Sequence, residues 1–195
     1  MIESVLTKRN ASVRMALTVK TLLSAAVIAL AVLLPQLVHL AAGPGGGVRF
    51  LPMYLPVLLG GCLLGARWGL CVGLLSPLVS FLVTAAVGTP MPAAERLPFM
   101  MAELAVFACV TGLFSGKIMK NGLWAFPAVG LAELSGRAFF LLLAAACSAV
   151  TSLSPALVWS QIVTGLSALA VQAVAVPLAV LWLRALLLRD SHDGH

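Results

Sequence analysis

Three charged residues lie inside otherwise apolar stretches of the chain: Glu103, Glu133 and Arg137. If those stretches cross a membrane, each charge is costly and should face a polar cavity or a partner of opposite charge. Glu133 and Arg137 are four residues apart, so in a helix they lie one turn apart and could form an ion pair. They could instead line a polar pocket together with Glu103. The sequence leaves both interpretations open.

The other residues that could do chemistry are too dispersed for a catalytic or metal site. The cysteines lack the CxxC spacing of zinc sites and redox pairs, and His39 has no second ligand at helical spacing. These cysteines are Cys62, Cys71, Cys109 and Cys147. The chain also lacks GxSxG and the phosphate-binding GxxxxGK[ST]. We therefore expect no catalytic residue, no metal site and no resident cofactor, with any ATP hydrolysis carried out by partner subunits.

The composition is that of an integral membrane protein. Of 195 residues, 62% are hydrophobic and 9% are charged, and the mean hydropathy is +1.10. A soluble domain of this length would need more charged side chains to cover its surface, whereas a bundle in lipid exposes apolar residues. The net charge of +6 is then explained by membrane topology and contact with anionic lipid, without nucleic acid as a partner.

Apolar windows of about 20 residues, the length that crosses roughly 30 Å of hydrocarbon, predict an all-α bundle of six transmembrane helices. The expected helices are Lys20 to Leu40, Leu51 to Gly65, Trp68 to Val87, Pro98 to Lys117, Leu123 to Val150 and Pro155 to Leu188. Residues 20–188 would form one membrane domain, preceded by a segment at 1–19 and followed by a tail at 189–195.

The distribution of basic residues predicts that both termini are cytoplasmic, because cytoplasmic loops retain Lys and Arg. With the N-terminus inside, nine basic residues fall on the cytoplasmic side and only Arg49 and Arg96 fall outside. The nine are Lys8, Arg9, Arg14, Lys20, Arg67, Lys117, Lys120, Arg184 and Arg189.

A run of glycines at every fourth position predicts close helix packing. Gly61 and Gly65 precede the turn marked by Arg67, and Gly69 and Gly73 follow it. Small residues four apart clear one helix face, so neighbouring backbones can approach. We interpret this hairpin as a packing element.

The connections at 41–50, 88–97 and 151–154 would face the outside. Tyr54 and Trp159 lie near this level and could form aromatic walls, while Gln161 adds a polar group from the last helix. For Gln172 we expect an interhelical hydrogen bond. A pocket that opens outward beneath flexible loops would suit the capture of a small solute.

The chain resembles the substrate-binding S components of energy-coupling factor (ECF) vitamin transporters. The resemblance is carried by "LPMYLPVLLGGCLLGARWGLCVGLLSPLVSFL", by "GTPMP" and by "LPFMMAELAVFACVTGLFSG", within a chain of six expected helices. It extends over most of the chain from Leu22 to Leu188.

The resemblance implies binding of a vitamin or related cofactor precursor at the outer side of a bacterial or archaeal cell membrane. It implies assembly with a transmembrane T component and two cytosolic ABC-type ATPases, with Ala25 and Ala29 contacting the T component. Matching regions bring further residues into the expected ligand site. Together with Tyr54, the expected ligand-binding residues are Arg49, Glu103, Arg137, Trp159 and Gln161.

Two further questions stay open at this point. A self-sufficient secondary transporter or channel, using Glu103, Glu133 and Arg137 as a proton or ion relay, is the alternative function. The ligand is not identified by the resemblance, so cobalamin, a queuosine-type deazapurine and pantothenate all remain candidates.

Overall fold

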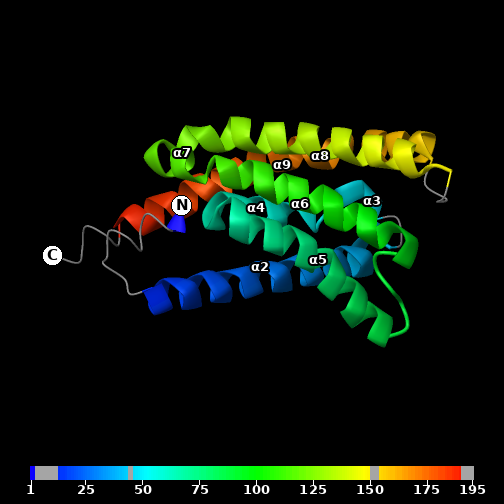
Figure 1. The fold of residues 1–195 in the computed structure, drawn as a ribbon, viewed down its shortest axis with the longest axis horizontal. Coiled ribbons are helices and arrows are strands. Elements are labelled where there is room, and N and C mark those ends of the chain that lie inside the picture. The colour runs from blue at the N-terminus through cyan, green and yellow to red at the C-terminus, as the bar shows by residue number, and fades with distance from the viewer. Residues whose placement is uncertain (3–12, 44–45, 150–153, 190–195) are drawn as a thin grey trace.

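The computed structural model describes residues 1–2, 13–43, 46–149 and 154–189, which form a bundle of helices (Figure 1). In chain order, its helices are α2 (Val13–Ala42), α3 (Gly46–Phe50), α4 (Tyr54–Leu64), α5 (Ala66–Ala86), the 3-10 turn η1 (Ala94–Arg96), α6 (Leu97–Leu113), α7 (Ser115–Lys120), the 3-10 turn η2 (Gly122–Trp124), α8 (Ala125–Cys147) and α9 (Pro155–Arg189). In Figure 1, α4 and α6 lie between a layer formed by α2 and α5 and a layer formed by α8 and α9.

Five helices of the described part are long and apolar enough to cross a membrane, so the protein is a multi-pass membrane protein. They are Arg14–Ala42, Ala66–Ala86, Ala94–Leu113, Gly122–Cys147 and Pro155–Leu186. The predicted helix at 51–65 is shorter than expected. Its regular part, α4, has 11 residues, which gives a length of about 16 Å at a rise of about 1.5 Å per residue.

α4 is a buried core helix. Nine of its 11 residues are buried, and it packs against α2, α5, α6 and α9. A helix that is apolar on every side must be surrounded by other apolar groups, and here the longer helices provide them. The start of α4 therefore lies inside the bundle, where Tyr54 is only 4% exposed.

The glycine run packs the α4–α5 hairpin against α6, as the spacing predicts. A Cβ atom added to Gly61 would lie 2.5 Å from the carbonyl oxygen of Ala108, and one added to Gly69 would lie 2.8 Å from the same oxygen. A Cβ atom on Gly73 would overlap the carbonyl group of Leu104. Gly65 has a different role, because its φ of 87° makes the turn between the two helices.

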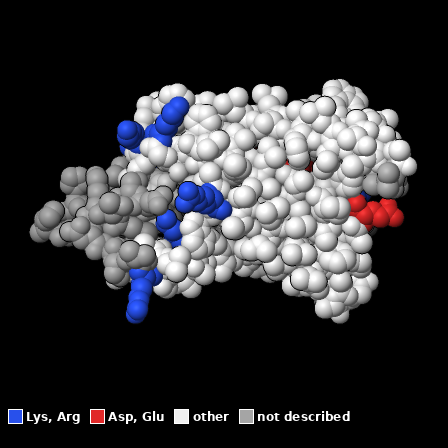
Figure 2. Space-filling model, viewed as in Figure 1, with Lys and Arg blue, Asp and Glu red and all other residues white. Residues whose placement is uncertain are grey.

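The two ends of the bundle differ in charge. In Figure 2, lysine and arginine side chains gather at the end that carries α7 in Figure 1, and acidic side chains appear at the opposite end. Met1 and the end of α9 lie at the basic end (Figure 1). This separation agrees with the predicted grouping of basic residues at one end of the bundle.

The helical region begins earlier than the predicted boundary at residue 20, because α2 starts at Val13. Met1 and Ile2 are buried in the main core cluster. Lys8 and Arg9 of the expected N-terminal segment, and most of the expected tail at 189–195, lie outside the described residues.

Candidate ligand-binding cavity

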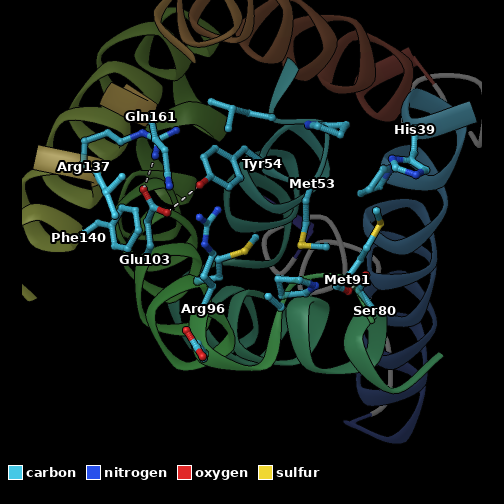
Figure 3. Close-up of a pocket in the computed structure, with 18 residues that line it drawn as sticks. His39, Met53, Tyr54, Ser80, Met91, Arg96, Glu103, Arg137, Phe140 and Gln161 are labelled. Atoms are coloured by element: carbon cyan, nitrogen blue, oxygen red, sulfur yellow. Dashed lines mark hydrogen bonds and ion pairs between the residues drawn. The ribbon is translucent and has the colours of Figure 1, made fainter. Parts of the chain in front are cut away.

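A cavity of about 570 Å³ lies at the end of the bundle opposite the basic end. Its walls come from the end of α2, the α3–α4 connection with the first residue of α4, the α5–α6 connection, and parts of α5, α6, α8 and α9. The lining residues are Pro35, His39, Leu51, Pro52, Met53, Tyr54, Ser80, Met91, Pro92, Ala93, Glu95, Arg96, Met100, Glu103, Arg137, Phe140, Leu157 and Gln161. In Figure 3, Glu103, Arg137, Phe140 and Gln161 line one side of this space, and His39 and Ser80 line the other.

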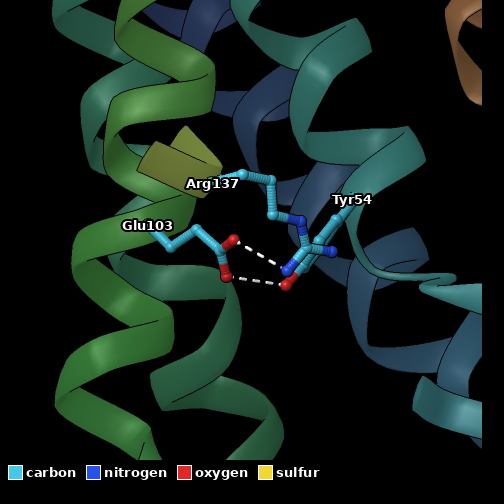
Figure 4. A network of polar contacts seen from close by, with 3 residues as sticks. All are labelled: Tyr54, Glu103 and Arg137. Carbon is cyan, nitrogen blue, oxygen red and sulfur yellow. Dashed lines mark hydrogen bonds and ion pairs between the residues drawn. The ribbon is translucent and has the colours of Figure 1, made fainter. Parts of the chain in front are cut away.

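Three residues from three helices form a polar network in the cavity wall (Figure 4). Tyr54 of α4 donates a hydrogen bond of 2.7 Å from Oη to Oε2 of Glu103 on α6. Nη1 of Arg137 on α8 lies 3.0 Å from Oε1 of the same carboxylate. Glu103 has no exposed surface and the Arg137 side chain is 9% exposed. The network therefore compensates charges that are removed from water.

Aromatic packing holds this network in place. The guanidinium carbon of Arg137 lies 4.9 Å from the centroid of the Tyr54 ring, a cation–π arrangement. The ring of the same tyrosine packs edge-to-face with Phe107, with ring centroids 5.1 Å apart and an interplanar angle of 82°. Phe107 in turn occupies the space that a side chain at Gly136 would need. Gly136 thus lets α8 approach α6 one residue before Arg137.

The structure fits neither interpretation of Glu133 and Arg137 in full. Arg137 pairs with Glu103 on another helix, and the described residues contain no ion pair between Arg137 and Glu133. Glu133 is 8% exposed but does not contribute to the cavity wall. The i,i+4 ion pair is therefore not formed, because the guanidinium of Arg137 extends across the helix interface instead of along its own helix.

Four of the six predicted ligand-binding residues meet at this cavity: Tyr54, Glu103, Arg137 and Gln161. Whether they bind a ligand stays a prediction. Arg49 and Trp159 are not among the described residues that line the cavity.

Both exceptions have a geometric reason. Trp159 is 58% exposed and lies two residues from both Leu157 and Gln161, which do line the cavity. Because each helical residue turns by about 100°, Trp159 faces away from those two neighbours. Arg49 is exposed on α3, and its guanidinium carbon lies 5.8 Å from the centroid of the Phe50 ring.

Several cavity residues were not predicted from the sequence. Met53, Met91 and Met100 line the cavity from three different segments, and Phe140 and His39 add two further rings. Phe140 could have been found, since it follows Arg137 by three residues and shares its helix face. The methionines carry no spacing signal, because the fold brings them together from separate segments.

The α5–α6 connection is fixed to α5 beside the cavity. The backbone N–H of Met91 donates a hydrogen bond of 2.7 Å to Oγ1 of Thr84. The hydroxyl of Ser80 donates one of 3.0 Å to the carbonyl oxygen of Met91. These bonds place Met91, and with it the segment that continues to Arg96, at the cavity wall.

Gln172 makes the interhelical hydrogen bond expected of it. Its Nε2 donates to the carbonyl oxygens of Leu51 at 3.0 Å and Phe50 at 3.3 Å. Leu51 has a φ of 46°, a left-handed conformation that is unfavourable for a leucine. The glutamine thus stabilises a strained turn that carries Leu51 into the cavity wall.

The described residues contain no group of three or more His, Cys, Asp or Glu side chains that could hold a metal ion. Ala25 and Ala29, the residues expected to contact a T component, are both exposed on α2. Comparison of the chain with protein-family models, curated proteins and solved structures finds no match in any of the three.

Proposed function

We propose that this chain is a membrane-embedded solute-binding protein of the S-component type. In this proposal it captures a vitamin or related cofactor precursor from outside the cell and delivers it inward within an ATP-driven ECF importer. The membrane is the cell membrane of a bacterium or archaeon, and the chain crosses it six times with both termini in the cytoplasm. The short helix α4 serves as the second span, together with the segment that precedes it.

The observation that carries this proposal is the cavity of about 570 Å³ at the end of the bundle opposite the basic end. This volume lies within the range of roughly 300–1,000 Å³ typical of small-molecule sites. Its wall is mostly apolar and contains a few polar groups from the Tyr54–Glu103–Arg137 network, the combination that gives both affinity and orientation. Basic residues tend to mark the cytoplasmic side of membrane proteins, which supports the part of the proposal in which the cavity opens toward the outside.

The energy source and the partners follow from the sequence resemblance. The chain has no ATP-binding motif, so the proposal assigns ATP hydrolysis to two cytosolic ABC-type ATPases and coupling to a T component. Ala25 and Ala29 are exposed one helical turn apart on α2, where a helix of the T component can approach closely.

Uptake and binding measured on the same protein test this function. We expect small molecules extracted from the purified chain to include one that rebinds, and its uptake into vesicles to require ATP and the partner module. The double variant Ala25→Leu/Ala29→Leu should keep the affinity for that compound while losing uptake and copurification of the ATPases. Ala41→Leu, also exposed on α2, is a matched control that should keep both.

Uptake of the same compound by vesicles that contain the chain alone would contradict the S-component proposal. That result would favour a self-sufficient secondary transporter or channel, in which Glu103, Glu133 and Arg137 act as a proton or ion relay.

A further inference from the structure

We infer that the cavity takes a neutral, planar nitrogen heterocycle whose edge carries a hydrogen-bond donor beside an acceptor. In this arrangement the heterocycle donates to Glu103 and accepts from Arg137, while its faces lie against methionine and aromatic side chains. The inference rests on the proposed function, and it names the chemical class of the solute that the site binds.

The charges of the wall favour a neutral solute. The acidic residues that line the cavity are Glu95 and Glu103, and the basic ones are Arg96 and Arg137, so the formal charges cancel with His39 neutral. The two deepest of these charges already neutralise each other, because Arg137 and Glu103 lie 3.0 Å apart. A bound anion or cation would have to break this pair or bury a charge without a counter-ion, and both are costly.

The Glu103–Arg137 ion pair has both hydrogen-bond donors and a hydrogen-bond acceptor that are not used within the described residues. Nε and Nη2 of Arg137 donate no hydrogen bond to any described residue. Oε1 of Glu103 has only the ion-pair contact with Arg137 and accepts no hydrogen bond within the described part of the chain. Buried polar groups are normally satisfied, so this ion pair leaves two donors and one acceptor unused among the described residues. A lactam or amidine edge offers the complementary pair.

The remainder of the wall suits a flat ring. Met53, Met91 and Met100 line the cavity, and Phe140 lies near Arg137 on the same side of it (Figure 3). Methionine sulfur is polarisable and makes favourable contacts with aromatic rings. Sugars and polyols, by contrast, would need polar partners over most of their surface, which this wall lacks.

Extraction and probe binding test the class of solute. We expect mass spectrometry of the extract from purified protein to identify an uncharged nitrogen heterocycle. Among added probes, hypoxanthine, isocytosine and nicotinamide should raise the thermal unfolding midpoint more than pantothenate, choline or nicotinate. Nicotinamide and nicotinate are the decisive pair, because they share one ring and differ in charge. We expect the wild-type protein to bind nicotinamide at least about tenfold more tightly.

Two carboxylate variants show whether Glu103 sets this preference. Glu103→Gln leaves Arg137 without its counter-ion, so the site becomes cationic and should bind nicotinate more tightly than nicotinamide. Glu133→Gln removes another buried carboxylate from the helix that carries Arg137, but one outside the cavity wall, and should keep the wild-type preference. Folding of each variant is checked by size-exclusion profile and thermal midpoint.

The outcomes separate this inference from the proposed function. An extracted anion or cation that rebinds, or tighter wild-type binding of nicotinate than nicotinamide, would overturn the inference and leave solute binding intact. An unchanged preference in folded Glu103→Gln protein would also overturn it. If Glu103→Gln does not fold, the wild-type extract and the nicotinamide–nicotinate pair still decide. The proposed function fails, and the inference with it, if no compound is extracted and no probe shifts the midpoint.

Discussion

The two halves of the bundle use the same helices in opposite ways. Toward the basic end, glycines on α4 and α5 bring those helices against the backbone of α6 around Ala108. Toward the other end, α4 and α6 carry the larger polar side chains Tyr54 and Glu103, and a cavity lies beside them. The closed half is held by small residues and backbone contact. The cavity half is held by a charge pair and hydrogen bonds.

Residues of the closed half determine how the helices pack, whereas residues of the cavity half also form the candidate binding site. Four residues before Ala108, Leu104 supplies the carbonyl that Gly73 packs against, and the next residue toward the N-terminus is Glu103. Close packing at Gly73 therefore fixes the height and rotation of α6 at the point where Glu103 enters the cavity wall. We expect mutations in the closed half to act through folding, and mutations in the cavity half to act through folding and binding together.

Removing the cation of the cavity half should have the largest effect. Arg137→Met leaves the fully buried carboxylate of Glu103 without its counter-ion, and should lower the free energy of unfolding by about 3 kcal/mol. The double variant Arg137→Met/Glu103→Gln removes both charges and should recover at least about half of that loss. Unfolding in mixed micelles, followed by helical circular dichroism, measures each value.

The cycle of single and double variants contains its own control. If the losses of Arg137→Met and Glu103→Gln simply add in the double variant, the two side chains are not energetically coupled. The ion pair would then not account for the stability of the cavity half.

Adding a methyl group in the closed half should lower the free energy of unfolding by less than Arg137→Met does, and it does not touch the polar network directly. Gly73→Ala places a Cβ atom against the backbone of Leu104, which should cost about 1–3 kcal/mol because backbone cannot rotate away as a side chain can. Gly130→Ala on α8 is the matched control, since a Cβ atom there meets nothing within 4 Å. It should leave stability unchanged or raise it by up to about 1 kcal/mol through helix propensity. Equal losses in both variants, measured as above, would contradict tight packing at Gly73.

The closed half could largely be predicted from the sequence, because its signal is local. The spacing of Gly61, Gly65, Gly69 and Gly73 predicts a hairpin packed through small residues, and the structure confirms it. The extent of α4 could not be predicted. Hydropathy marks 51–65 as apolar without showing that the positive φ of Leu51 delays the helix until Tyr54.

The cavity half was predicted only in part, because its contacts join distant segments. Intrahelical spacing suggested Glu133 as a partner for Arg137, whereas the pair with Glu103 depends on how α6 and α8 pack. No local pattern contains that information. That Trp159 does not line the cavity could have been anticipated, since helical periodicity puts it on a different face from Gln161.

Weakening the attachment of the α5–α6 connection to α5, in the cavity half, should change stability least of the three predictions. Thr84→Val keeps the shape of the side chain but removes the oxygen that accepts the Met91 N–H, a bond of 2.7 Å. One neutral hydrogen bond contributes about 1 kcal/mol, so local opening should raise amide exchange at Met91 about fivefold. Global stability should fall by no more than about 1 kcal/mol. Hydrogen exchange with mass spectrometry of peptides that cover 88–96 measures the local effect, and Thr84→Ser, which retains the hydroxyl, should exchange as the wild type does.

If the Val and Ser variants exchange alike, the hydroxyl does not hold the connection, and the cavity wall at Met91 depends on packing, as the closed half does.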